Sequence, residues 1–309
     1  WTATARHADI VLPATTTLER DDLTSSGGDR FIMAMHKSVE PVDEARNDFA
    51  IFRELADRLG IADAFDEGRD EAGWIRHLYD LAHDLSAKNG VELPDFDTFW
   101  EQGYVELPPP AKPFVLFEDF QNDPEANPLR TPSGKVEIFS ETIAGFEYDD
   151  CPGHPVWQEP AEWLGSEVAS RFPLHMISNQ PTTRLHSQMD QGRTSRDSKI
   201  NGHEPITMHP ADAAARGLTD GDIARVFNER GEFLAGATTS DDILSGVVAL
   251  ATGAWYDPSE PGKAGTLDKG TSKRAQGPSA QSALVEIERY DGVAPEITVF
   301  SQPTIIREP

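Results

Sequence analysis

The chain has 309 residues, with 27 Lys or Arg against 53 Asp or Glu, and its formal net charge is −26. This excess of negative charge repels phosphate backbones and argues against a nucleic-acid partner. No stretch reaches the roughly 18 apolar residues that a membrane-spanning helix needs, so we expect no membrane span and up to two soluble domains. The single cysteine, Cys151, excludes a disulfide framework within the chain and a cysteine-rich metal site.

The first part of the chain, residues 1–93, predicts an incomplete α/β region. The apolar run Ala8–Leu12 is typical of a buried strand, and an α/β sheet would normally have earlier strands beside it. We therefore expect the chain, which starts at Trp1 without a methionine, to be a piece of a longer protein. A turn at two glycines precedes a second expected strand over Arg30–Val39.

Two helices follow in the same region. Their expected bounds are Glu44–Leu59 and Glu71–Lys88, and Gly60 and Gly90 stand where a left-handed residue would end each helix. The apolar side chains recur at helical spacing, so we expect them to face the core. They are Phe49, Phe52, Leu55, Ala56 and Leu59 in the first helix and Trp74, Leu78, Leu81 and Leu85 in the second.

Residues 94–169 are rich in proline and predict an extended connector rather than a domain core. Within it, the turn Thr131–Gly134 precedes an expected half-buried strand over Lys135–Ser140. The aromatic residues around Cys151–Trp157 leave two interpretations open. They line a substrate entrance, or they fill a seam between domains.

The last part, residues 170–309, predicts a compact β-rich domain. A short helix is expected over His209–Gly217, because a proline stands in its first turn and a glycine at its end. Several short strands with one small helix favour a closed barrel, which leaves no sheet edge unpaired. The expected strands are Leu174–Ile177, Ile223–Phe227, Glu232–Thr239, Val247–Ala251 and Ala283–Glu288.

A polar loop, Ser178–Gln188, directly follows the first of these strands. A proline ends the strand, and Asn, Gln, Arg, His and Ser side chains then offer donors and acceptors suited to a flat heterocycle with phosphates. We interpret this loop as ligand-facing, with a plain surface loop as the alternative. Motifs of competing chemistries, namely H-E-x-x-H, G-x-x-x-x-G-K-[ST], G-x-G-x-x-G and G-x-S-x-G, are absent from the sequence.

Several distinctive segments occur in order along the chain: Trp1–Thr16, Leu18–Asp22, Thr131–Glu137, Arg184–Gln188, Gly253–Pro258 and Gly270–Gly277. Together they resemble the carboxy-terminal half of the dimethyl sulfoxide reductase family of molybdopterin oxidoreductases. Asn179–Pro181 and Leu267–Ser272 are most similar to the branch of the biotin sulfoxide and trimethylamine-N-oxide reductases. The resemblance implies an α/β fold class, with a partial α/β dinucleotide-binding domain followed by a β-rich barrel of the double-psi type.

The resemblance also implies a molybdenum enzyme that holds its metal between two molybdopterin guanine dinucleotides, the cofactor Mo-bisMGD. Such an enzyme moves an oxygen atom from an S- or N-oxide to the metal, with biotin sulfoxide, dimethyl sulfoxide and trimethylamine N-oxide as expected substrates and the electron donor left open. The family's serine ligand to molybdenum and its substrate contacts lie in the amino-terminal half. We therefore expect no catalytic or metal-ligating residue in this chain, and that missing half as its partner. The biotin sulfoxide branch implies the cytoplasm, with the periplasm also open.

Cofactor-binding residues are implied by position within the family's motifs. At the first dinucleotide, Arg20 is expected to pair with phosphate and Asp48 to accept from a guanine edge, beside Trp1 and Thr2. At the second, Arg184 is expected to face phosphate. The full set at the second dinucleotide is Gln180, which stands where several relatives carry His, with Arg184, His186, Ser187, Gln188 and Gln281.

One departure from the family lies at Gly265–Lys269, which runs straight through where the family has an additional loop with an Asn beside the pterin. We expect one cofactor contact to be missing there, with weaker cofactor binding as the consequence. The alternative from a different functional class is a non-catalytic nucleotide-binding or structural module built on the same barrel.

Overall fold

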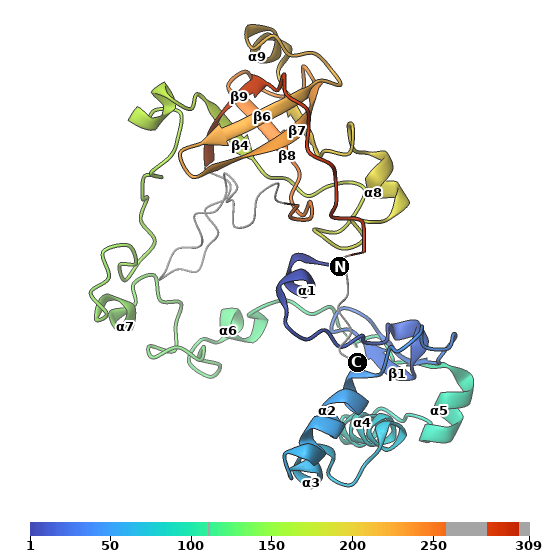
Figure 1. Cartoon of the computed structure of the whole chain (residues 1–309). Coiled ribbons are helices and arrows are strands. Elements are labelled where there is room, and N and C mark those ends of the chain that lie inside the picture. Colours follow the sequence, from blue (N-terminus) through green and yellow to red (C-terminus); the bar gives the residue numbers. More distant parts are fainter. Residues whose placement is uncertain (111, 258–282, 303–309) are drawn as a thin grey trace. The chain divides into compact units, whose positions relative to one another are not determined.

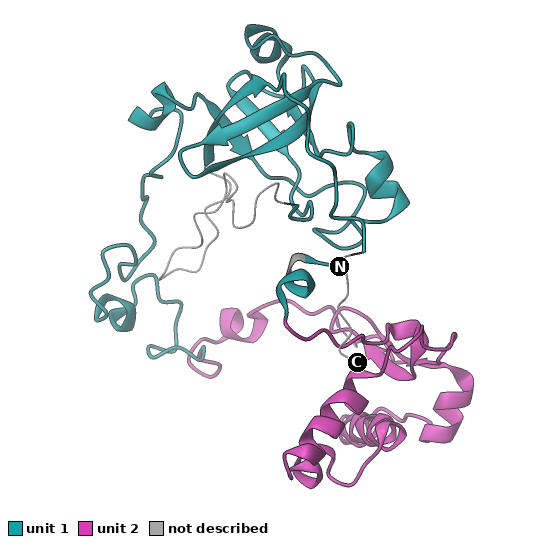
Figure 2. Ribbon diagram, in the orientation of Figure 1, with its two compact units in different colours: residues 1–8, 129–309 teal, residues 9–128 magenta. Residues whose placement is uncertain are grey.

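The computed structural model describes residues 1–110, 112–257 and 283–302 (Figure 1). The chain divides into two compact units, which we name the barrel unit (residues 1–8 and 129–309) and the helical unit (residues 9–128) (Figure 2). We predicted three parts, with boundaries after residues 93 and 169. These boundaries differ from those of the two units, and the three-part division stays a prediction. Within the described ranges, no helix has the length and apolarity needed to cross a membrane.

The helical unit combines helices with a small antiparallel sheet. Its elements are η1 (Thr17–Glu19), β1 (Asp22–Ser25), β2 (Phe31–Met35), α2 (Asp48–Arg58), α3 (Ala62–Asp66), α4 (Glu71–Lys88), α5 (Phe96–Gln102), β3 (Tyr104–Glu106) and α6 (Glu118–Asn122). Strand β2 lies between β1 and β3. It confirms the strand expected after the glycine turn, but it ends at Met35, four residues earlier than predicted. The stacked rings of Tyr79 and Phe99, with centroids 4.1 Å apart, are almost fully buried. Part of the expected connector therefore belongs to this core.

The helix positions in this unit follow from their caps. Helix α4 has the predicted bounds, because the Asp70 side chain caps its first turn and Gly90 takes a left-handed φ of +76° after its end. Helix α2 begins four residues later than predicted, at Asp48, because the Asn47 side chain accepts a hydrogen bond from the Phe49 amide and caps the helix there.

The predicted inward faces of these two helices are largely wrong. The buried side chains are Ala56, Ile75 and Tyr79. Apolar side chains occupy more than one stripe of each helix, and only the stripe that other elements of the chain cover becomes buried. Most of the side chains that we expected in the core are exposed, namely Phe52, Leu55, Leu59, Leu78, Leu81 and Leu85.

The expected strand over Ala8–Leu12 is also wrong. These residues lie in no strand, and the Ile10 side chain is 78% exposed. The pairing next to them is a single bridge between Ala14 and Arg46. An apolar run becomes a strand only where another strand supplies hydrogen-bonding partners, and none in the described part of the helical unit does so here.

The barrel unit contains the strands that were expected in the last part of the chain. Its elements are α1 (Ala3–His7), α7 (Glu141–Ala144), η2 (Glu167–Ser170), β4 (Leu174–Ile177), α8 (Arg193–Asp197), β5 (Pro205–Met208), α9 (Pro210–Ala215), β6 (Ile223–Asn228), β7 (Gly231–Thr239), β8 (Val247–Leu250) and β9 (Ala283–Arg289). The strands close into a barrel in the order β4-β8-β5-β7-β6-β9, which confirms the predicted closure.

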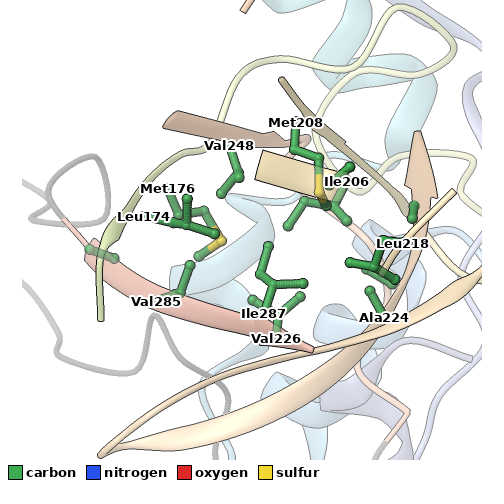
Figure 3. Packing of buried hydrophobic residues seen from close by; sticks show 14 residues of the cluster. Leu174, Met176, Ile206, Met208, Leu218, Ala224, Val226, Val248, Val285 and Ile287 are labelled. Atoms are coloured by element: carbon green, nitrogen blue, oxygen red, sulfur yellow. The ribbon is translucent and has the colours of Figure 1, made fainter. Parts of the chain in front are cut away.

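The barrel core is built from residues that alternate along each strand. Leu174 and Met176 of β4 are both at most 1% exposed, and they meet Val248 of β8 and Val285 of β9 inside the barrel (Figure 3). This alternation is the signature of a sheet with one buried face. Strand β5 was not predicted, because it begins at a proline and contributes only two inward side chains, which are Ile206 and Met208.

The strand expected over Lys135–Ser140 is absent from the barrel unit. The turn before it is present, with the Gly134 amide donating to the Thr131 carbonyl at 3.0 Å. However, Val136 and Ile138 are 66% and 81% exposed, and no described strand pairs with them. Alternating apolar residues therefore did not form a strand here, because no described strand lies beside them to supply hydrogen-bonding partners.

Candidate functional site

Two polar segments meet where strands β4 and β8 end. These strands are parallel neighbours with Ile177 opposite Ala249, so the segments that follow them leave the barrel side by side. The Thr252 amide donates to the Asn179 carbonyl at 2.9 Å, and the Trp255 indole Nε1 donates to the Ser187 carbonyl at 2.7 Å. The fold thus brings the motif Arg184–Gln188 next to the described part of the motif Gly253–Pro258, residues 253–257, which lies far away in the sequence.

Close packing fixes the backbone at this junction. Gly253 has a left-handed φ of +88°, and a Cβ atom there would stand 2.0 Å from the His186 carbonyl oxygen. Only glycine fits such an approach. His186 itself has a positive φ of 50°, as does Met189 with 59°, and positive φ is uncommon for residues with a side chain. The loop is therefore held in an unusual conformation, which is frequent at ligand sites.

Arg184 anchors the loop from inside. Its guanidinium is fully buried and donates four hydrogen bonds. The acceptors are the His186 carbonyl (3.0 Å), the Ser195 hydroxyl (3.2 Å), a Glu204 carboxylate oxygen (3.0 Å) and the Thr252 carbonyl (2.9 Å). This one side chain thus connects the loop, helix α8 and the segment after β8.

Four charged side chains form a buried quartet around this arginine. Lys199 Nζ lies 2.9 Å from an Asp190 oxygen and 2.7 Å from a Glu204 oxygen, and Arg184 Nε lies 3.4 Å from Asp190. None of the four side chains is more than 9% exposed, and their formal charges cancel. Burial alone would raise the pKa of Asp190, but hydrogen bonds from the Trp255 amide, Lys199 and Ser195 outweigh burial and hold that pKa below its ordinary value.

The exposed face of the loop carries the polar side chains that were predicted to meet a ligand. His186, Ser187 and Gln188 are exposed, and their side chains form no hydrogen bond with any residue that the structure describes. Gln180 is also exposed and donates to the Arg184 carbonyl at 3.2 Å. The donors and acceptors of His186, Ser187 and Gln188 are thus exposed on a backbone that Arg184 and Trp255 fix through hydrogen bonds.

Arg184 was expected to face phosphate, but its side chain is oriented toward the interior of the chain. Its donors are directed at carbonyls, a hydroxyl and a carboxylate of the chain, and the side chain reaches no solvent. In this structure Arg184 positions the loop through its hydrogen bonds. Its contact with phosphate stays a prediction, and no donor of its side chain points toward solvent to support it.

The residues expected at the first dinucleotide fall into different units. Trp1 and Thr2 belong to the barrel unit, where the Thr2 hydroxyl caps helix α1 and Trp1 is 38% exposed. Arg20 and Asp48 belong to the helical unit. Arg20 donates to the Thr15 carbonyl at 3.1 Å and pairs with Asp22 at 3.3 Å, whereas Asp48 is exposed at the start of α2.

Two predicted features lie outside the described residues. They are Gln281, expected at the second dinucleotide, and the shortened segment Gly265–Lys269. No group of three or more His, Cys, Asp or Glu side chains within the described ranges is arranged to hold a metal ion.

Sequence reasoning missed the cationic cavity next to the loop and the residues of the quartet other than Arg184. The cavity, of about 590 Å³, lies between the stretch 193–202 and the segment 297–301, and Arg193, Arg196 and Phe300 line it. The stretch from Asp190 to Glu204 carried a signal in its mixture of acidic and basic residues. The sequence alone did not show which of them would be buried.

Comparison with known proteins agrees with this arrangement. Residues 174–284 match the molydopterin dinucleotide binding domain, and residues 1–58 match the molybdopterin oxidoreductase family. The chain is 49% identical to the dimethyl sulfoxide/trimethylamine N-oxide reductase of Cereibacter sphaeroides over 98% of its own length and 38% of that protein. It is 45% identical to the trimethylamine-N-oxide reductase of Haemophilus influenzae, over 98% of its own length and 39% of that protein.

A solved structure is similar in fold. Acetylene hydratase from Pelobacter acetylenicus matches 94% of the chain with a TM-score of 0.61 at 21% identity, and the match covers 39% of that enzyme. The chain spans less than two fifths of the length of the two reductases above. With matches to both family regions and similarity to these reductases over nearly all of its length, the chain belongs to the molybdopterin oxidoreductases and carries their dinucleotide-binding domain.

Proposed function

We propose that the chain is the cofactor-binding carboxy-terminal part of a molybdenum enzyme that reduces S- or N-oxides by oxygen-atom transfer. The observation that carries this proposal is the loop Ser178–Gln188, in which the exposed side chains of His186, Ser187 and Gln188 stand on a backbone fixed by Arg184, Gly253 and Trp255. A preorganised set of donors and acceptors of this kind suits a rigid heterocycle. The similarity to reductases that are named for these oxides supports the substrate class.

The residues of the barrel unit fit one molybdopterin dinucleotide of Mo-bisMGD. His186, Ser187 and Gln188 would donate to and accept from the edge of the pterin, and Gln180 would add a further amide. When bound, the molybdenum of the cofactor supplies the oxygen-atom transfer. The chain's own residues would bind and orient the group, because hydrogen bonds of Arg184 and Trp255 fix the backbone that carries them.

The remaining predicted contacts belong to the same proposal. Trp1, Thr2, Arg20 and Asp48 would contact the first dinucleotide. Gln281 would contact the second dinucleotide, together with the residues of the loop. Arg20 retains donors beyond its bonds to Thr15 and Asp22, and the Asp48 carboxylate is exposed. A guanidinium and a carboxylate are suited to phosphate and to the paired donors of guanine, respectively.

Complementation tests this function against the non-catalytic alternative. The chain is co-expressed with the remaining part of the Cereibacter sphaeroides relative, and reduction of dimethyl sulfoxide, trimethylamine N-oxide and biotin sulfoxide is followed with a reduced dye. The remaining part alone is the control. Oxide reduction only in the presence of the chain is the expected result. An assembled complex without any reduction would favour a binding or structural module.

A further inference from the structure

A cavity of about 590 Å³ beside helix α8 gathers positive charge in a strongly acidic chain. Arg193, Arg196 and Lys199 line it on one side, and Phe300 and Ser301 line it on the other. The cavity has the size of a site for a small organic ligand. The whole chain carries a net charge of −26, so three positively charged side chains at one cavity are an unusual local concentration of positive charge.

Two of these cations form no ion pair with an acidic side chain in the described part of the chain. Most of the described arginines form an ion pair with a carboxylate, as Arg171 does with Glu229 and Arg216 with Glu286. Arg193 and Arg196 form none with the residues that the structure describes, although Asp197 also lines the cavity. They stand three residues apart on α8, so their side chains share one face of the helix. Their guanidinium donors are therefore available to a ligand.

The other cations near the loop are already engaged. Lys199 belongs to the buried quartet with Asp190 and Glu204, and Arg184 spends its donors within the chain. Close to the loop, a phosphate-bearing ligand would therefore find the arginines without a described ion pair at α8. Arginine is well suited to that role, because its planar donors match phosphate oxygens in pairs.

The far wall of the cavity is held in place by two charged side chains. Asp257 accepts from the Thr298 and Val299 amides at 2.7 and 2.9 Å, and Arg6 donates to the Ser301 carbonyl at 2.7 Å. Phe300 in this turn lies with its ring centroid 5.5 Å from the Arg196 guanidinium. The aromatic ring thus holds Arg196 at the cavity by a cation–π contact.

We propose that this cavity is a phosphate-binding site in which Arg193 and Arg196 hold the diphosphate of a nucleotide. The assignment rests on the proposed function of the chain as a dinucleotide-binding part, and it moves the phosphate contact of the barrel unit from Arg184 to α8. Phosphate groups carry the charge, while the remaining volume accommodates part of the nucleoside.

Binding of GDP and of pyrophosphate to the full 309-residue chain tests the proposal, measured by titration calorimetry at low salt. The test variant is Arg193→Gln/Arg196→Gln, and the matched control is Arg130→Gln/Arg171→Gln, which removes the same charge from other exposed positions of the barrel unit. Loss of two charge-assisted contacts is expected to weaken both ligands about tenfold or more in the test variant and to leave the control unchanged. Unchanged melting temperatures of both variants show that they are folded.

Equal binding by the test variant and the natural chain would overturn the proposal, as would the absence of GDP and pyrophosphate binding by the natural chain. The molybdenum content of the assembled enzyme separates this outcome from a failure of the proposed function. High molybdenum content with GDP binding that ignores the two arginines would place the phosphates elsewhere on a genuine cofactor-binding part. Arginine-dependent GDP binding without any molybdenum would support the anion site and contradict the proposed function.

Discussion

Removal of one charge from the buried quartet gives the sharpest test of how the loop is held. In Glu204→Gln, one of the two carboxylate oxygens is replaced by an NH2 group, so a donor faces either Arg184 or Lys199 where an acceptor stood before. The quartet then keeps two cations and one carboxylate, and a positive charge stays buried without compensation. We expect a large loss of stability and a loosened loop.

The geometry sets the size of the effect. Coulomb's law with an effective dielectric constant of about 20 gives about 6 kcal/mol for two unit charges at the 2.7 Å that separate Lys199 Nζ from Glu204. Part of this energy offsets the cost of removing both groups from water, and breaking one side of a buried pair typically costs about 3–5 kcal/mol. We therefore expect Glu204→Gln to lower the free energy of unfolding by about 3 kcal/mol or more.

Urea unfolding followed by circular dichroism measures this loss. Glu229→Gln serves as the matched control, because its ion pair with Arg171 is exposed, and it should change the stability by less than about 1 kcal/mol. Addition of Lys199→Met to Glu204→Gln restores the charge balance, so the double variant should lose less than the sum of the two single losses. A Glu204→Gln effect as small as that of the control, with additive losses, would refute a dry and coupled quartet.

Three further changes probe the loop and the helical unit. Gly253→Ala should cost about 2 kcal/mol or more in urea unfolding, because its Cβ would collide with the His186 carbonyl at a positive φ; a stability like that of the natural chain would contradict this close approach. Trp255→Phe keeps a ring but loses the bond to the Ser187 carbonyl, so it should cost about 1 kcal/mol and speed amide exchange in the loop, and unchanged exchange would mean that the bond does not hold it. Burial, with Asp21 nearby, raises the pKa of Glu71, so the folded state keeps this proton to higher pH than the unfolded chain and stability is lost as the pH rises through the raised pKa. Glu71→Gln should therefore raise the melting temperature at neutral pH and change it little below the ordinary pKa of 4.5; an equal effect at both pH values would exclude this cause.

The barrel could be predicted because the alternation of apolar and polar residues in its strands is visible in the sequence. Leu174 and Met176 alternate with less buried neighbours, and a turn that ends at Gly231 joins β6 to β7. Each strand finds its partners within the chain, so local pattern and final structure agree. The predicted polar loop likewise lies at a barrel end, because the strand before it ends there.

The helical unit was harder to predict because its apolar residues do not all find partners in this chain. The run at Ile10 and the stripes at Leu55 and Leu81 have the pattern of core residues but lie exposed. Periodicity shows that a side chain is suited to burial, but it does not show what covers it. The chain spans less than two fifths of the length of the two reductases, and within the described residues these side chains stay exposed.

The position of the site was predicted correctly as the polar loop after β4. The sequence did not show which side chains of the loop support it from the interior and which are exposed. A loop with Arg184, His186 and Gln188 reads as a single polar surface, because the sequence does not show which side chains turn inward. The partners that draw Arg184 into the interior, Asp190 and Glu204, are six and twenty residues away, and the fold alone brings them to it. The free arginines of α8 became visible only once the ion pairs of the others were known.

Joint analysis of molybdenum and guanine nucleotide is the most direct test of the claim that this chain holds part of a molybdopterin cofactor. The chain is purified alone and after co-expression with the remaining part of the Cereibacter sphaeroides relative; molybdenum is read by mass spectrometry and GMP after acid release. We predict both in the assembled protein, and a strong loss of both when Gly253→Ala displaces the loop at His186. A folded assembly that contains neither molybdenum nor GMP would contradict the assignment.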